Sequence, residues 1–321
     1  MAIVAIGFNP AIDRIIECPD FHIGGHQQAS QRALLAAGKA ANVNRALAQL
    51  GTDSIASGFV GSTELEFFHE QLMSTGPGRV LCRFVEVTGK TRENITILDP
   101  KRRIETHLRD KGFAVTRDET ALLEQKVMHE LKPGDVAIFS GSLCEGLSAD
   151  YFGTLLDKCA ATGARVAVDS SGDPLRAAAE HGIWLLKPNL EELRQLLGVE
   201  VPNTAASIRD AASPLLKNAK NVLVTRGPLG AVLLTTEGGA VAYSGRVGRV
   251  GGDGGAPRRT VGCGDHLLAG FVSEMVAGRS AQQSLATALA LATARAMSEK
   301  LDEIDQALLK ESLQQIQIEK I

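Results

Sequence analysis

Short apolar segments alternate with amphipathic segments along most of this chain. Runs of β-branched and aliphatic residues predict buried strands at 2–7, 136–140, 165–169, 183–186, 222–225 and 231–235. Apolar residues at helical spacing predict helices at 41–50, 149–162, 191–197, 265–278, 281–299 and 303–316. This alternation predicts an α/β fold with a mainly parallel sheet covered by helices on both faces, whose ligands lie at the carboxyl ends of the strands.

Two regions, at about 10–35 and 80–110, depart from this alternation. They carry polar, strand-like segments such as 79–87 and 93–99, which by composition alone predict edge hairpins. A glycine-rich segment at 246–259 predicts a mobile loop, which is either an ordinary surface loop or an element that closes over a site. We find no internal repeat.

Composition narrows the class of protein. The chain has 321 residues, 44% hydrophobic and 22% charged, and its 34 basic and 37 acidic residues give a net charge of −3. Because there is no basic surplus and no long apolar run, we expect no nucleic-acid partner and no membrane span. The first residues are strand-like rather than a signal peptide, and the five cysteines are scattered without a CxxC pair. These features predict a cytoplasmic protein with reduced thiols.

The segment from Thr260 to Phe271 carries the strongest chemical signal. Gly262 and Gly264 flank a small residue, and Asp265 follows them at the expected start of a helix. Glycines let the backbone approach an anion, and the first turn of a helix presents unpaired N–H groups with partial positive charge. A carboxylate beside such a site is the minimum needed to move a phosphoryl group to a hydroxyl. These residues alone slightly favour the alternative, a tight turn with Asp265 as the helix cap.

Two other nucleotide-binding motifs are only partly matched. Gly262 and Gly264 do not complete a dinucleotide fingerprint and lie far from the first strand, which argues against a dehydrogenase. Gly38 and Lys39 resemble the end of a P-loop, but Ala40 follows where that motif requires Ser or Thr.

Seven short segments occur in the order found in one known family. They are 7–14, 36–47, 91–94, 140–143, 187–193, 224–230 and 260–271, and they include Asn42-Val43, Thr91-Arg92-Glu93-Asn94, Lys187-Pro188-Asn189 and Gly262-Cys263-Gly264-Asp265. Each segment is weak evidence alone, but together they span nearly the whole chain. The sequence resembles the ribokinase-like carbohydrate kinases (the phosphofructokinase B family), and within them the 1-phosphofructokinase and tagatose-6-phosphate kinase branch.

The resemblance implies a fold and an activity. The fold would be a single three-layer α/β/α domain over 1–321, with a small β-sheet lid from about 10–35 and 80–110 that often forms a homodimer contact. The activity would be that of a phosphotransferase with an alcohol acceptor. It would use ATP and Mg²⁺ to phosphorylate a primary hydroxyl of a hexose phosphate.

The resemblance also implies roles for individual residues. Asp265 would be the catalytic base, and the N–H groups of Gly262, Cys263 and Gly264 would hold the developing negative charge. His266 stands where the family usually has Ser, and we expect an exposed histidine in the first turn or a contact to a nucleotide phosphate. Sugar hydroxyls would be bound by a further set: Asp13, Gly38 and Asn42.

Lys39 and Arg92 would bind the phosphate of a phosphorylated sugar, Arg92 bidentately; the alternative for Arg92 is a solvated charge on the lid. Asn189 and Glu192, next to Lys187, would organise Mg²⁺ through waters, whereas Glu192 alone suits an ordinary first-turn carboxylate. The nucleotide would pack on a turn that is equally typical of a plain hairpin: Thr225, Gly227 and Gly230.

Some positions depart from the family's pattern. Ala37 and Ala40 replace glycines near the lid, and Gly25-His26-Gln27-Gln28 lacks the arginine that phosphosugar members often carry there. Two alternatives therefore stay open beside the phosphosugar kinase. One is a kinase of an unphosphorylated sugar, and the other is a catalytically silent protein that binds nucleotide or sugar.

Overall fold

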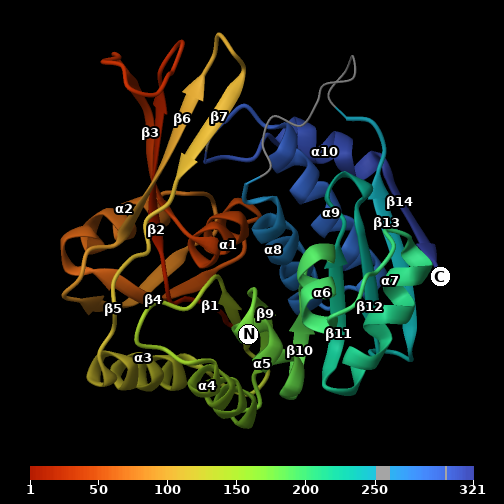
Figure 1. The fold of residues 1–321 in the computed structure, drawn as a ribbon. Helices are drawn as coiled ribbons and strands as arrows, with labels where there is room; N and C mark the ends of the chain where they lie inside the picture. Colours follow the sequence, from red (N-terminus) through yellow and green to blue (C-terminus); the bar gives the residue numbers. More distant parts are fainter. Residues whose placement is uncertain (251–260, 301) are drawn as a thin grey trace.

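A computed structural model of the protein describes residues 1–250, 261–300 and 302–321, and its body is built on one large sheet (Figure 1). Its strands follow the order β14-β13-β12-β11-β10-β9-β8-β1-β4-β5. Neighbours from β5 to β11 are parallel and those from β11 to β14 antiparallel, so the predicted mainly parallel sheet is confirmed. The strands span Ile3–Gly7 (β1), Ser54–Gly61 (β4), Val80–Val87 (β5), Val136–Ser140 (β8), Arg165–Asp169 (β9), Ile183–Leu186 (β10), Ala219–Thr225 (β11), Ala231–Thr235 (β12), Val241–Val247 (β13) and Ile316–Lys320 (β14).

Helices pack on both faces of this sheet. One face is covered by α3 (Arg117–Glu130), α4 (Ala149–Ala161), α5 (Asp173–Glu180), α6 (Leu190–Leu197) and α7 (Ala205–Ala212). The other face is covered by α1 (Lys39–Gln49), α8 (Cys263–Val276), α9 (Ala281–Met297) and α10 (Gln306–Gln314), with α2 (Leu65–Met73) beside α1. Short 3-10 turns lie at Ser62–Glu64, Ser213–Lys217 and Gly227–Leu229. The result is the expected three-layer arrangement.

The hydrophobic core explains the apolar runs of the sequence. In β1, Ile3 to Ile6 are at most 1% exposed, because a central strand is covered on both faces and cannot alternate. Phe139 and Phe152 pack edge to face with ring centroids 5.6 Å apart. Within the described residues, no helix has the length and apolar character needed to cross a membrane.

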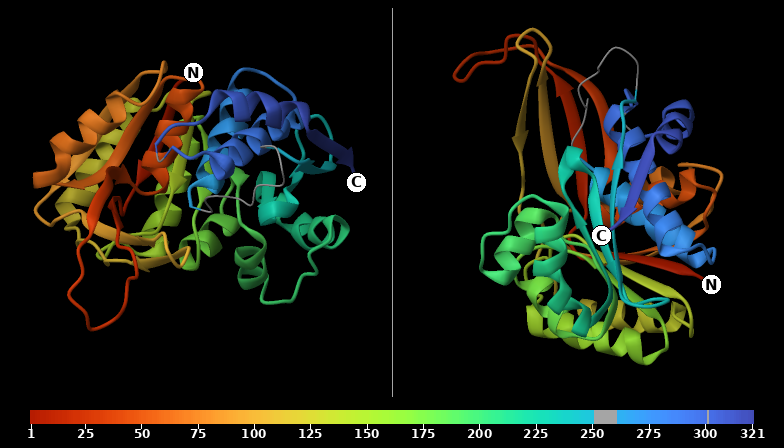
Figure 2. Two further views of the ribbon diagram at one scale, coloured as in Figure 1. Left: turned by 90° about the horizontal axis from the view of Figure 1, so that it is seen from above. Right: turned by 90° about the vertical axis from the view of Figure 1, so that its right-hand side faces the viewer.

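A separate four-stranded sheet forms the lid. It comprises β2 (Ala11–Glu17), β3 (Ser30–Ala37), β6 (Arg92–Asp99) and β7 (Ile104–Leu108), in the order β3-β2-β6-β7. β2 and β6 are parallel, with Asp13 beside Asn94, while both outer pairs are antiparallel. Figures 1 and 2 show these strands extending away from the body, above α1 and α2 in the view of Figure 1. The two sequence regions that broke the α/β alternation therefore come together in space.

Three expectations need correction. The segment 79–87 is not part of the lid, because β5 pairs in parallel with β4 at the edge of the large sheet. The helix expected at 303–316 is shorter, and the chain then adds β14 as the opposite edge of the sheet. The predicted mobile loop at 246–259 lies largely outside the described residues. The other predicted helices and strands are confirmed to within three residues at either end.

Candidate active site

The amino end of α8 forms the centre of the candidate site. Gly262 adopts φ 84°, a left-handed conformation that favours glycine, and α8 begins at the next residue. Asp265 lies in the first turn and is only 5% exposed. The N–H groups at the start of the helix and the absence of a side chain at Gly264 make this end of α8 suitable for an anion.

The Asp265 carboxyl is held by one neutral partner and by several charges. Asn42 Nδ2, from the first turn of α1, donates to Asp265 Oδ2 at 2.8 Å. Burial and the negative charge of Asp169 raise the pKa of Asp265 to about 7, against the opposing effects of Asn42, Lys39 and Lys187. A carboxyl that titrates near neutrality is suited to accept a proton and later release it.

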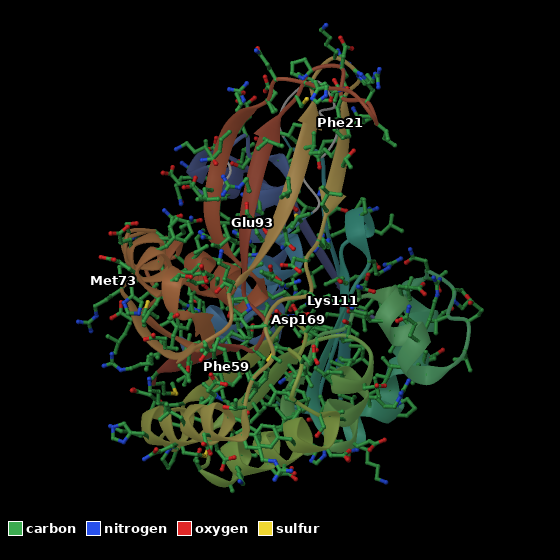
Figure 3. All side chains as sticks on the ribbon, turned by 60° about the vertical axis from the view of Figure 1, so that its left-hand side comes forward. Phe21, Phe59, Met73, Glu93, Lys111 and Asp169 are labelled. Atoms are coloured by element: carbon green, nitrogen blue, oxygen red, sulfur yellow. The ribbon has the colours of Figure 1, made fainter. Side chains whose placement is uncertain are left out.

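Two lysines neutralise Asp169 next to this carboxyl. Asp169 ends β9 and is 1% exposed, and Figure 3 places it beneath the lid strands. Lys39 Nζ donates to its Oδ1 at 2.8 Å, and Lys187 Nζ lies 3.1 Å from its Oδ2. Burial alone would raise the pKa of Asp169, but Lys187 and Lys39 hold it below its usual range. The trio is a fixed charge cluster at the carboxyl ends of the strands.

Lys187 also faces the amino end of α8. A methyl group placed on Gly264 would lie 3.5 Å from Lys187 Nζ. An ammonium group and the N–H groups of a helix start therefore border the same small space. Together they can stabilise the negative charge of a phosphoryl group more strongly than either could alone.

His266 does not lie where it was expected. It is 3% exposed rather than exposed, and its Nδ1 lies 2.8 Å from the Gly262 carbonyl oxygen. Burial and the positive charge of Arg295 lower the pKa of His266 to about 3, so the ring is neutral and Nδ1–H donates to Gly262. The histidine supports the glycine turn from inside, and the expectation of an exposed first-turn residue is wrong.

Residues of the lid, α1, α9 and the turn before α8 line an open cavity of about 120 Å³. Asp13 and Asn42, two of the predicted sugar-binding residues, line it together with Gly262. Asn94 Nδ2 donates to Asp13 Oδ1 at 2.9 Å and fixes that carboxylate on the inner face of the lid. The structure therefore brings two of the three predicted hydroxyl-binding residues to one cavity, and one of them, Asn42, is bonded to the predicted base.

Gly38 joins the lid to α1 at a tight point. It adopts φ 103°, and a Cβ there would lie 3.1 Å from Pro10 Cα, so a larger residue would strain the junction. Lys39 follows and lines a small cavity with Asn9 and Pro10. Because its ammonium group is bound to Asp169, Lys39 is directed toward the charge cluster beside Asp265.

Arg92 is a half-buried anchor rather than a solvated charge. Its guanidinium donates to the carbonyl oxygens of Asn9 at 3.0 Å and Pro10 at 3.2 Å. Burial and the nearby Arg109 lower its pKa, so a second arginine lies close to it. Asn94 lies beside Asp13 in the register of β2 and β6. Alternation along β6 therefore places Arg92 and Asn94 on the same face of the lid as Asp13.

The predicted nucleotide and metal residues lie where β10 and β11 end. Asn189 and Glu192 form a capping box at the start of α6, with both reciprocal hydrogen bonds at 2.8 Å. Thr225 N donates to the Pro188 carbonyl oxygen at 3.1 Å, which brings Thr225 next to Asn189. Glu192 therefore has a structural role at the start of the helix. One of its two carboxylate oxygens takes no part in the capping box.

The two glycines of the nearby turn have structural reasons to be glycine. Gly227 and Gly230 adopt φ 58° and 87°. A Cβ on Gly230 would overlap the Gly245 carbonyl oxygen at 2.0 Å, so the turn between β11 and β12 requires glycine with or without a ligand. Their predicted contact with a nucleotide stays a prediction.

The described residues do not form a preassembled metal site. Among the described residues, no cluster of three or more His, Cys, Asp and Glu side chains is arranged to hold a metal ion. Both oxygens of Asp169 face lysine ammonium groups, whereas Glu192 lies near enough to Lys39 to raise its pKa. These residues fit Mg²⁺ only as acceptors for the waters that the ion retains, since Mg²⁺ usually keeps several.

Several site residues were missed at the sequence level. Asp169 has no motif of its own, although its place at the end of a buried strand was a usable signal. Arg45 and Arg295 line the same cavity as Asn42. They come from helices far apart in the chain, and only the packing of α9 and α1 on α8 brings them together.

Comparison with known proteins identifies the family of the chain. A model described as the pfkB family carbohydrate kinase matches residues 3–303. The chain is 30% identical over 316 residues to a 1-phosphofructokinase from Bacillus subtilis, covering 96% of this chain and 98% of that one. It is 28% identical over 319 residues to a tagatose-6-phosphate kinase from Staphylococcus epidermidis, covering 98% and 99%.

Among solved structures, phosphofructokinase-2 from Escherichia coli, in complex with substrates and products, matches with a TM-score of 0.88. That match has 25% identity and covers 98% of this chain and 99% of the other. The family model and the structural match both span nearly the whole chain, as the seven ordered segments do. The chain belongs to the pfkB family of carbohydrate kinases.

Proposed function

We propose that this protein transfers the γ-phosphoryl group of ATP to a primary hydroxyl of a hexose phosphate. One observation carries the proposal. The buried Asp265, with a pKa of about 7, lies in the first turn of α8 beside a lysine-neutralised carboxylate, and its hydrogen-bond partner Asn42 lines the lid cavity. The relatives named 1-phosphofructokinase and tagatose-6-phosphate kinase support a phosphorylated sugar as the acceptor.

In this proposal Asp265 is the general base. Its free oxygen accepts the proton from the sugar hydroxyl as that oxygen attacks the γ-phosphorus, and the bond from phosphorus to the bridging oxygen of ADP breaks. The N–H groups of Gly262, Cys263 and Gly264 and the ammonium of Lys187 stabilise the negative charge of the transferring group. Burial raises the pKa of the Cys263 thiol, which suits a small neutral residue at this position.

The sugar would lie in the lid cavity with its hydroxyls against Asp13, Asn42 and the Gly38 backbone. Its phosphate would bind at Arg92, and Arg109 adds a second guanidinium close by. Lys39 would act on the transferring γ-phosphoryl group rather than on the sugar phosphate, because its ammonium group is bound to Asp169. In this proposal Arg109 supplies the second arginine for the sugar phosphate, because residues 25–28 contain none.

The nucleotide would pack on the turn formed by Thr225, Gly227 and Gly230, next to Lys187 and Asn189. Mg²⁺, held through water by Asn189 and the free oxygen of Glu192, would supply charge neutralisation of the ATP phosphates. A homodimer formed through the lid and a cytoplasmic location remain predictions from the sequence.

The test is ATP consumption with Mg²⁺ against fructose 1-phosphate, fructose 6-phosphate, tagatose 6-phosphate, fructose and ribose. We expect turnover confined to a phosphorylated sugar and a loss of about 10²-fold or more in Asp265→Asn, with ATP binding retained. Asp135→Asn is the matched control: this buried carboxylate accepts from the Ala2 backbone N–H at the opposite end of the strands, so turnover should persist.

Each contrary outcome points elsewhere. Turnover with a free sugar that Arg92→Ala leaves unchanged would replace the proposal with a kinase of unphosphorylated sugars. ATP binding without turnover on any of the sugars would favour a silent binding protein. Full turnover by Asp265→Asn would remove Asp265 as the base.

A further inference from the structure

Arg45 is a buried arginine that the proposed reaction does not use directly. It lies on α1, is 5% exposed and borders the lid cavity. Both of its hydrogen-bond acceptors are neutral: Nη1 donates to Asn42 Oδ1 at 3.0 Å and Nη2 to the Ala36 carbonyl oxygen at 2.7 Å. Burying a guanidinium with neutral partners is costly, so this arrangement asks for an explanation beyond packing.

The surroundings do not supply that explanation. The charged groups that act on Arg45 are Arg295 from α9, which repels it, and Asp302 and Asp13, which attract it. Burial and Arg295 lower its pKa to about 10, so Arg45 still carries its charge at neutral pH. Its Nε is buried without a hydrogen-bond partner. The group is therefore positioned by the two acceptors named above rather than by a buried ion pair.

Asn42 connects Arg45 to Asp265. Its carbonyl oxygen accepts from Arg45, and its amide nitrogen donates to Asp265 Oδ2 at 2.8 Å. A carboxamide presents an acceptor on one side and a donor on the other, so the cation at one end decides which atom faces the carboxylate at the other. Without Arg45, the amide could rotate and turn its oxygen toward Asp265.

We propose that Arg45 is a positioning residue that orients the Asn42 carboxamide and thereby fixes the catalytic base Asp265. The inference rests on the proposed function, because it takes Asp265 to be the base. Arg45 also donates to the carbonyl oxygen of Ala36 at the end of lid strand β3. The same guanidinium therefore holds Asn42 in a fixed position relative to this end of the lid.

The experiment compares Arg45→Met, Asn42→Ala and the double variant by the pH dependence of kcat/KM. The groups that face Asp265 and stay unchanged are Asp169, Lys39 and Lys187. We expect Arg45→Met to lower kcat/KM by about tenfold to a hundredfold and to move the acid limb to higher pH, because Asp265 loses its fixed hydrogen bond. The KM for ATP should stay within about twofold, since a general-base defect does not weaken nucleotide binding.

The double variant should be no worse than Asn42→Ala alone, since Arg45 acts through Asn42. Arg45→Lys should recover part of the loss, because one ammonium can still reach the Asn42 oxygen. The matched control is Arg165→Met, a half-buried arginine whose guanidinium lies 4.9 Å from the Trp184 ring centroid; it should lose stability without moving the acid limb.

Two outcomes would overturn the inference alone. One is an unmoved acid limb in Arg45→Met, and the other is a double variant whose losses multiply; both would mean a purely structural role. If Arg45→Met does not fold, Arg45→Lys and its double variant with Asn42→Ala carry the same comparison. Full turnover by Asp265→Asn would instead overturn the base assignment, and the inference with it.

Discussion

At the scale of single residues, the site depends on charges kept away from water. Asp169 is neutralised by two lysines, whereas Asp265 accepts a hydrogen bond from Asn42 and has a pKa of about 7. The two carboxyls thus have opposite pKa shifts because their partners differ. A pair of this kind is typical of a site in which one carboxyl is structural and the other exchanges a proton.

The titrations of His266 and Asp265 change the free energy of unfolding in opposite directions as the pH falls. His266 has a folded pKa of about 3 against an ordinary value of 6.5, so the unfolded chain binds more protons and stability falls as pH drops below 6.5. Asp265 has a folded pKa of about 7 against 3.8, so the folded chain binds more protons and stability falls as pH rises through that window. Between about pH 4 and 6.5 the two slopes oppose each other.

We predict that the variant His266→Asn isolates the contribution of His266 to the pH dependence of the free energy of unfolding. The free energy of unfolding of the unmodified protein, relative to this variant, should fall by about 1.4 kcal/mol per pH unit below pH 6.5, because only the unmodified chain gains a proton there on unfolding. Urea unfolding at pH 7.5, 6.5 and 5.5 measures this difference. Parallel profiles would show that His266 is not held neutral by burial.

At the scale of elements, the same local structures serve both folding and the site. α8 begins at a glycine turn that a helix start needs in any case, and α6 begins with a capping box between Asn189 and Glu192. A second capping box of the same type, between Thr116 and Glu119, begins α3 away from the site. The pair of boxes allows the structural role of Glu192 to be separated from its proposed metal role.

We predict that Glu192→Gln raises the Mg²⁺ concentration needed for half-maximal activity several-fold, while Glu119→Gln leaves it unchanged. Each glutamine can still accept from the backbone of its cap residue, and each helix loses one first-turn carboxylate, a cost of about 0.3–1 kcal/mol. The measurements are activity as a function of Mg²⁺ and thermal unfolding of both variants. Equal Mg²⁺ dependence would argue that Glu192 is a cap and nothing more.

At the scale of the whole molecule, the lid has two different faces. Its inner face contributes Asp13, Thr96 and His107 to the lid cavity. On the other face, alternation along β7 places Leu108 and Ile104, which are 53% and 49% exposed. Half-exposed apolar side chains on an edge strand are typical of a contact with another chain.

We predict that the protein is a homodimer through this outer face of the lid, and that Leu108→Arg shifts it toward the monomer. A buried unpaired cation at the contact would cost several kcal/mol, enough to raise the dissociation constant at least a hundredfold. Sedimentation equilibrium measures the change. Lys310→Glu on α10, an exposed charge reversal, is the control, and a dimer that survives Leu108→Arg would place the contact elsewhere.

The sequence predicted much of the α/β frame. The strands and two of the helices between 136 and 235, and the helices between 263 and 297, were found because buried strands there are continuously apolar and these helices are strongly periodic, whereas the short helices α5 and α7 were missed. It predicted β5 as a strand but assigned it to the lid, and it missed β14, because edge strands are only half buried and their sequences resemble those of loops or lid hairpins. Register and sheet membership depend on partners that lie far away in the chain.

The family, the glycine turn before α8 and the order of the motifs were determined by the sequence itself, since each is local and needs only neighbouring residues. Only the tertiary structure decided that His266 is buried, that Lys39 is bound to Asp169, and that Arg45 reaches Asp265 through Asn42. These facts are contacts between segments up to 223 residues apart. Their geometry follows from how α1, α8 and the strand ends pack, which no local pattern contains.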